Sequence, residues 1–122
     1  MHRLSLTARL TSAAALFAVL GIIAAPALGV RSQASAAAVT VTATEFKFKL
    51  SKLTVTHGTV VFTVANKGKI PHDFKINGKK TSLIKPGKTA KLSVTFKAGK
   101  FKYLCTVPGH AALGMKGTLT AK

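Results

Sequence analysis

Phe101-Lys-Tyr-Leu-Cys105-Thr-Val-Pro-Gly-His110-Ala-Ala-Leu-Gly-Met115-Lys-Gly117 is the most informative stretch of this chain. Its first five residues alternate with a period of two, which places the two aromatic rings and the thiol on one face of a strand. Proline and glycine residues then mark the turns of a loop, and a second strand is predicted to begin at Gly117. The stretch therefore predicts two neighbouring strands joined by a loop that carries His110 and Met115, with Cys105 at the end of the sheet.

The side chains of this stretch form a set of metal donors. Cys105, His110 and Met115 follow one another at equal spacings of five residues and offer a thiolate, an imidazole and a thioether. A second imidazole is available from His72, which directly follows Pro71. Two His, one Cys and a weak axial Met make up the donor set of type 1 copper sites. We therefore predict one mononuclear type 1 copper per chain, bound by His72, Cys105, His110 and Met115.

This donor set favours electron transfer over catalysis. Copper(II) prefers nitrogen and oxygen donors whereas copper(I) prefers soft sulfur donors, and a mixed set serves both oxidation states. Four ligands leave no open position at which a substrate or a water molecule would bind. We therefore expect no enzymatic activity and no catalytic residues. Asp73, beside His72, has no partner for acid–base chemistry and is predicted to be solvated.

Each donor has a simpler alternative interpretation. Cys105 could be a buried free thiol, His110 an ordinary loop residue and Met115 a filler of the core. The rival to His72 is His57, which stands in an apparent turn and is predicted to be an ordinary surface residue. The single cysteine excludes an internal disulfide, so the unpaired thiol of an exported domain needs another explanation. Metal ligation supplies one.

Residues 1–36 are predicted to be a signal peptide. Two arginines precede an uncharged, mostly apolar run from about residue 13 to residue 30, and small residues follow. Ala34-Ser35-Ala36 fits a small-x-small cleavage pattern, which leaves residues 37–122 as one mature domain. Because the apolar run is close to the lower limit of a membrane span, an uncleaved N-terminal membrane anchor is the alternative. In both cases the domain is expected to be exported, to the periplasm, the cell surface or the medium.

The charge of the chain is strongly positive. Its formal net charge is +17, and beyond the leader it contains lysine but no arginine, with only Glu45 and Asp73 as acids. Such a surface attracts anionic partners, which could be an acidic redox protein, an anionic cell-surface polymer or lipid. Nucleic acid is not expected, because arginine is the usual residue for bidentate phosphate recognition and no aromatic-basic RNA motif accompanies the lysines.

From residue 39 onward the pattern is that of an all-β domain. Apolar and polar residues alternate, and turn residues interrupt the alternation at short intervals, as is typical of an antiparallel sandwich or barrel. Asn77-Gly78 is the strongest hairpin signal. We expect about seven to eight strands, within residues 39–44, 45–50, 54–56, 59–66, 72–76, 89–96, 101–105 and 117–121, and almost no helix.

Four motifs occur together in this domain: Glu45-Phe-Lys-Phe, Val60-Val-Phe-Thr-Val-Ala-Asn66-Lys-Gly68, His72-Asp-Phe, and the stretch from Tyr103 to Gly117. Together they resemble the cupredoxins, the family that includes plastocyanin, azurin and rusticyanin, and the ligand spacing is similar to the rusticyanin and azurin style. The resemblance implies a Greek-key β-sandwich and copper ligation by the four donors named above. It also implies that Asn66 braces the ligand loop through hydrogen bonds. A binuclear copper centre is excluded, because the loop lacks a second cysteine.

The function expected from these observations is that of an exported, monomeric type 1 copper protein that shuttles single electrons between a redox donor and a redox acceptor. Exchange is expected to run through His110, beside an apolar patch at residues 111–113, and surrounding lysines would steer a partner with an acidic docking surface. The alternative is a copper carrier or storage protein that uses the same ligands without redox turnover. A basic, surface-adhering module with incidental copper is a third interpretation.

Overall fold

Nine strands and one short 3-10 helix are present in the part of the chain that the computed structural model describes, namely Gly21 and residues 36–122. They are β1 (Ala37–Thr44), β2 (Lys47–Leu50), β3 (Thr54–Val55), β4 (Gly58–Asn66), β5 (Lys75–Ile76), β6 (Lys79–Lys80), β7 (Thr89–Phe96), β8 (Gly99–Leu104), η1 (Ala111–Leu113) and β9 (Lys116–Ala121). Apart from Gly21 and Ala36, the predicted signal peptide lies outside the described residues. Among the residues described, no helix has the length and apolar character needed to cross a membrane.

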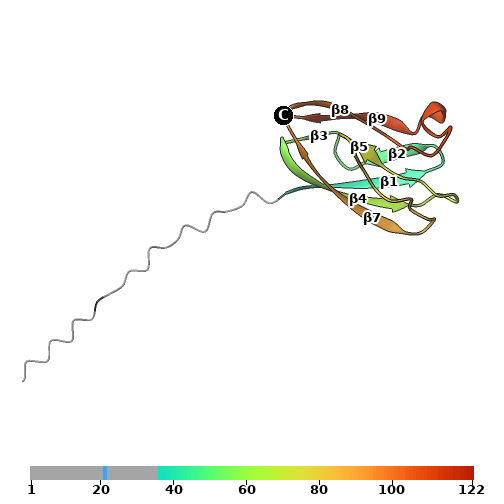
Figure 1. Cartoon of the computed structure of the whole chain (residues 1–122), viewed down its shortest axis with the longest axis horizontal. Helices are drawn as coiled ribbons and strands as arrows, with labels where there is room; N and C mark the ends of the chain where they lie inside the picture. The colour runs from blue at the N-terminus through green and yellow to red at the C-terminus, as the bar shows by residue number, and fades with distance from the viewer. Residues whose placement is uncertain (1–20, 22–35) are drawn as a thin grey trace, which may run out of the picture. The chain divides into compact units, whose positions relative to one another are not determined.

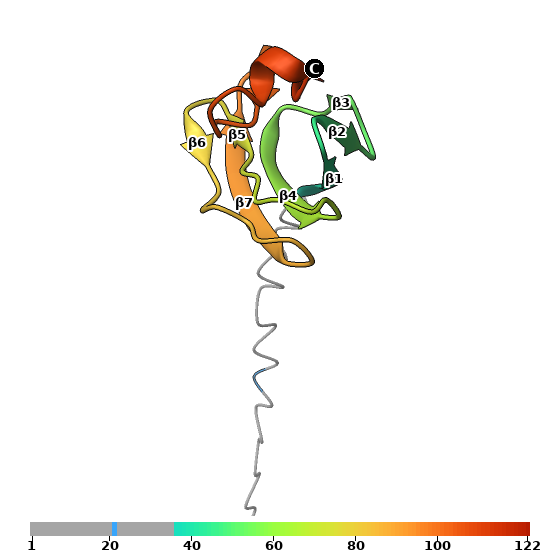
Figure 2. The same cartoon turned by 90° about the vertical axis from the view of Figure 1, so that its right-hand side faces the viewer.

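Two sheets form a sandwich (Figures 1 and 2). One has the strand order β2-β1-β4-β7 and the other the order β3-β9-β8-β5-β6. This confirms the predicted all-β sandwich. The additional strand is β6, which pairs with β5 across the predicted hairpin, where Asn77 and Gly78 both have positive φ.

The pairing is not purely antiparallel, in contrast to what the alternation suggested. β1 pairs with β4, and β3 with β9, in parallel. Parallel strands cannot be joined by a tight hairpin, so the chain must cross over between them. Residues 45–57 make one such crossover, because β2 extends the first sheet and β3 joins the second before the chain returns as β4.

The core lies between the two sheets and follows the period-two alternation. Every second residue of β4 is buried, ending with the side chains of Phe62, Val64 and Asn66. Burial of each large apolar side chain contributes about 1.5–3 kcal/mol to stability. Opposite Tyr103 stands Gly117, where a Cβ would overlap the phenol ring. This close approach explains why β9 carries a glycine there.

Register places two loops at the same end of the sandwich. β8 and β9 pair from Gly99–Ala121 at one end to Leu104–Lys116 at the other, so the loop that joins them, including η1, lies at the second end. β5 pairs antiparallel with β8, with Lys75 opposite Leu104, so His72, just before β5, lies at this same end. There it forms a bridge with Ile84, with hydrogen bonds of 3.1 and 2.7 Å between their backbones. Figure 1 shows η1 at the end of the sandwich opposite the C-terminus.

Candidate metal centre

Three of the four predicted donors converge in the structure. The donor atoms of His72, Cys105 and His110 all lie within 4.8 Å of one another, and all three residues are buried. The two Nδ1 atoms of His72 and His110 are 3.2 Å apart, and the Sγ of Cys105 is 3.6 Å from the Nδ1 of His110. Residues 33 positions apart in the sequence, His72 and Cys105, therefore meet in one cluster.

Met115 lies next to this cluster. Its side chain is fully buried and packs in a small apolar cluster with Cys105 and Ala43. Phe46, Phe48 and Val107 surround that cluster. The thioether is therefore on the same side of the sandwich as the thiol, as an axial donor requires.

The backbone of the β8–β9 loop holds its three donors in place. The amide of Cys105 donates to the carbonyl of Met115 at 3.1 Å, and the amide of Met115 donates to the carbonyl of His110 at 3.2 Å. Gly114 ends η1 with a φ of 112°, a conformation that glycine adopts without strain. These bonds tie the three donor residues to one another before any metal binds.

Asn66 braces the loop that carries His72, as the resemblance implied. Its amide donates to the carbonyls of Ile70 and Ile84, both at 2.8 Å, and its side-chain oxygen accepts from the amide of Gly68 at 2.8 Å. The Asn66 side chain has no exposed surface; its bond to Ile84 is buried, and those to Ile70 and Gly68 are partly buried. Asn66 thus links the loop before His72 to the segment that pairs with His72.

The prediction that Asp73 is solvated is wrong. Asp73 is buried, and its carboxylate accepts hydrogen bonds from the amide of Thr106, at 2.6 Å, and from the Thr106 hydroxyl. Since Asp73 follows His72 and Thr106 follows Cys105, this contact joins the two ligand-bearing segments directly. The alternation of a single strand could not show it, because the partner comes from a loop far along the chain.

The β1–β2 turn is a part of the site that the sequence analysis did not assign. Glu45 places an oxygen 3.5 Å from the Nε2 of His72, and the Phe46 ring packs edge-on against the His110 ring with centroids 5.0 Å apart. The sequence offered one signal, the placement of Glu45-Phe46 between two alternating runs, but periodicity alone treats such a turn as surface.

Burial sets the protonation of the donors. Removal of the His72 ring from water lowers its pKa, so the imidazole is neutral at neutral pH. Burial raises the pKa of the Cys105 thiol, which favours the protonated form without metal, and ligation of a metal by the thiolate would release that proton. The backbone amide of Lys69 holds the pKa of the Glu45 carboxyl below its usual range, which keeps this group anionic.

The donor arrangement fits a copper ion. Metal–nitrogen and metal–sulfur bonds of about 2.0–2.1 and 2.3 Å put two donors of one ion roughly 3–4 Å apart. The separations of 3.2 and 3.6 Å lie in that range. Two imidazoles with thiolate and thioether sulfur form the mixed set that suits copper in both oxidation states. His57, the rival histidine, is exposed and bonds through Nδ1 to the carbonyl of Lys122 at 2.7 Å, away from this cluster.

Comparisons with known proteins show the same fold. Auracyanin from Roseiflexus castenholzii, in its dithionite-reduced form, matches with a TM-score of 0.65 at 20% identity, over 71% of this chain and 98% of that protein. Auracyanin A from Chloroflexus aurantiacus, described as a blue copper protein, matches with a TM-score of 0.58 at 24% identity, over 70% of this chain and 99% of that protein. At these identities the likeness shows the fold.

A shorter match comes from a curated relative, the copper-resistant cuproprotein CopI of Pseudomonas aeruginosa. It is 46% identical over 41 residues, which is 33% of this chain, and the chain spans 23% of the length of CopI. A family model described as a cupredoxin-like domain matches residues 12–121. Because that model covers most of the chain, the protein belongs to the family of cupredoxin-like domains, and the resemblance to the cupredoxins is confirmed.

Proposed function

We propose that this protein is an exported type 1 copper protein that shuttles single electrons between redox partners. The observation that carries the proposal is the convergence of three buried donors, His72, Cys105 and His110, beside the buried Met115. Bound at these four residues, copper would supply the Cu(II)/Cu(I) couple. With the four donors occupied no position is left for a substrate, so we infer a carrier of electrons and no catalysis.

Hydrogen bonds around the site hold the proposed ligands in place, which supports rapid electron exchange. Backbone bonds fix Cys105, His110 and Met115 relative to one another, while Asn66 fixes the approach to His72. A donor set held between the preferences of the two oxidation states needs little movement when an electron arrives or leaves. The bracing is therefore part of the proposed function.

His110 is the proposed route for the electron. It retains 8% of its surface, whereas the other three proposed ligands retain 1% or less. Apolar residues lie around it: Leu113 and Leu83 are 63% and 57% exposed, and Ile70 and Leu83 line a hollow of about 430 Å³ that reaches His110. The apolar surface predicted at residues 111–113 thus extends to residues of two other loops, which would give a partner a wider docking area.

Charge is proposed to select that partner. All sixteen lysines of residues 36–122 are exposed. Both acids of this part, Glu45 and Asp73, are occupied by hydrogen bonds from backbone amides. A field of one sign would steer an acidic redox protein toward the domain. We expect the association rate with such a partner to fall as ionic strength rises, because salt screens exposed charges. An association rate that does not change with ionic strength would contradict this step.

A copper carrier with the same ligands is the second candidate, and the partial match to a copper-resistant cuproprotein favours considering it. The two functions differ in whether copper stays bound. The test is to reduce and reoxidise the copper-loaded protein through many cycles in the presence of a copper(I) chelator, with visible absorption as the signal. Retention of the metal with fast, reversible cycling supports electron transfer, and transfer of the metal to the chelator on first reduction supports carriage.

A further inference from the structure

The β1–β2 turn contacts both imidazoles of the proposed copper site. Glu45 approaches His72, and Phe46 packs against His110. Phe46 has a φ of 110°, a region that residues with a side chain rarely adopt and that usually marks a functional constraint. The Phe46 carbonyl is also close to Gly114 of the ligand loop. The turn therefore contacts both the segment that carries His72 and the loop that carries His110.

Glu45 holds the His72 loop through its backbone as well. One carboxylate oxygen accepts hydrogen bonds from the amides of Lys69 and Ile70, at 2.5 and 3.1 Å. The same oxygen lies against Gly68, where a Cβ would overlap the carboxylate. Glu45, from the β1–β2 turn, is thus hydrogen-bonded to two residues of the loop that leads to His72 and lies against a third, Gly68.

The two nitrogens of the His72 ring face different residues. Its Nδ1 faces His110, and its Nε2 is buried and makes no hydrogen bond, with an oxygen of the Glu45 carboxylate 3.5 Å away. The ring is fully buried, whereas the Glu45 side chain is 34% exposed. A carboxylate in this position favours a proton on Nε2, which leaves the Nδ1 lone pair free on the ligand side.

We propose that Glu45 is a positioning residue that fixes the tautomer of His72 and, through its negative charge, favours copper(II) over copper(I). This inference rests on the proposed copper site. Carboxylate partners of metal-bound histidines orient the ring and make it a stronger donor. A negative charge near the site stabilises the more positive oxidation state, so Glu45 lowers the reduction potential.

Three variants distinguish the effect of the Glu45 charge from that of its hydrogen bonds to the loop. In Glu45→Gln the amide oxygen can still accept from Lys69 and Ile70, so the loop keeps its brace while the charge is lost. In Glu45→Ala both are lost. The matched control is Lys47→Gln, which removes one exposed charge from the same hairpin without a contact to His72.

The first experiment measures the reduction potential of the copper-loaded full chain at pH 7. We expect Glu45→Gln to raise the ratio of copper(I) to copper(II) at a fixed potential about tenfold, equivalent to a shift of about 59 mV for one electron. Lys47→Gln should leave the potential unchanged. A potential for Glu45→Gln equal to that of the wild type would overturn the role of the charge.

The second experiment needs no metal. Nitrogen-15 NMR of the copper-free chain reports which ring nitrogen of His72 carries the proton. We expect a single Nε2–H tautomer in the wild type and a mixture in Glu45→Ala. An unchanged tautomer in Glu45→Ala would overturn the positioning role. Because this readout is independent of copper, failure of the wild type to bind copper would contradict the proposed function while leaving the contact between Glu45 and His72 testable.

Discussion

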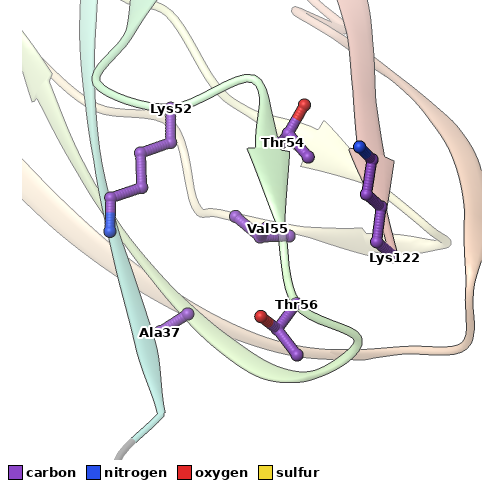
Figure 3. Close-up of a pocket in the computed structure, with 6 residues that line it drawn as sticks. All are labelled: Ala37, Lys52, Thr54, Val55, Thr56 and Lys122. Carbon is purple, nitrogen blue, oxygen red and sulfur yellow. The ribbon is translucent and has the colours of Figure 1, made fainter.

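The two ends of the sandwich are built from the same strands but differ in what their loops contain. At one end His72, Cys105, His110 and Met115 are buried together. At the other end, where β9 finishes, a hollow of about 260 Å³ is lined by Ala37, Lys52, Thr54, Val55, Thr56 and Lys122 (Figure 3). This second hollow contains no His, Cys, Met or carboxylate side chain.

Both ends carry a hollow, of about 430 Å³ beside His110 and about 260 Å³ where β9 finishes, so what distinguishes them is the convergence of buried donors. His57 lies at the end where β9 finishes, is exposed, and bonds to the carbonyl of Lys122. His72 is buried and faces a second imidazole. One histidine thus bonds to the C-terminal residue at one end of the sandwich, and the other belongs to the donor cluster at the opposite end.

The largest effect is expected from Cys105→Ser. Cys105 is the single cysteine of the chain, so the substitution removes the thiolate and with it the whole thiolate-to-copper absorption band. Copper(II) affinity should fall by more than the about 10–100-fold that loss of a supporting residue costs. The copper-free protein should lose about 1–3 kcal/mol from the buried hydroxyl and stay folded. Visible titration checks the first result, and a retained intense band would refute ligation by Cys105.

A pair of substitutions contrasts the two ends directly. Loss of a residue that supports a metal ligand costs about 10–100-fold in metal affinity. Because His72→Ala removes a proposed ligand itself, it should weaken copper(II) binding by at least that factor. His57→Ala should leave copper binding unchanged, because its ring bonds to Lys122. Isothermal titration with copper(II) checks both. Equal losses in the two variants would mean that binding is not confined to one end.

A smaller effect is expected from Asn66→Ala. The substitution leaves the carbonyl of Ile70 and the amide of Gly68 without their partner and removes one of two donors to the carbonyl of Ile84. Because the bonds to Ile70 and Gly68 are only partly buried and the Ile84 carbonyl keeps the His72 amide as a donor, we expect a loss of about 1–3 kcal/mol in the free energy of unfolding. Ser51→Ala, which removes an exposed hydroxyl bonded to Thr40, is the control and should cost less than about 1 kcal/mol. Urea unfolding of the copper-free proteins distinguishes the two, and equal losses would contradict the brace.

The smallest effect concerns the core between the ends. Burial raises the pKa of Tyr103, the single tyrosine of the chain, above its ordinary value of about 10. The unfolded chain therefore loses the phenol proton first, and the contribution of Tyr103 to stability, complete below pH 10, declines as the pH rises through the folded pKa. Ultraviolet titration of the copper-free protein follows this one group. Ionisation at pH 10 in the folded protein would show that the ring is open to water.

The sequence alone predicted the parts of the molecule that depend on local pattern. The strand alternation, the Asn77-Gly78 hairpin and the loop from Cys105 to Met115 all follow from neighbouring residues, and the structure contains them. Even His72 could be chosen over His57, because His57 stands in an apparent turn before Gly58. These features need only the period of a strand and the conformational preferences of turn residues.

The parts that escaped prediction depend on contacts between distant segments. Asp73 meets Thr106 because β5 pairs antiparallel with β8, with Lys75 opposite Leu104. Glu45 meets the loop before His72 because β1 and β4 run parallel, so the turns that follow them lie at one end. No periodicity in either segment records its partner. The same holds for the apolar surface near His110, where Leu83 and Ile70 come from two loops whose proximity no local pattern indicates.

The most direct test of the central claim, that four donors at one end form a type 1 copper site, is the visible and electron paramagnetic resonance spectrum of the copper(II)-loaded protein before and after a mild reductant. We predict an intense thiolate-to-copper band and a narrow copper hyperfine splitting, both lost on reduction and recovered on reoxidation. A weak absorption with the wide splitting of a tetragonal site, or irreversible oxidation of Cys105, would contradict the claim.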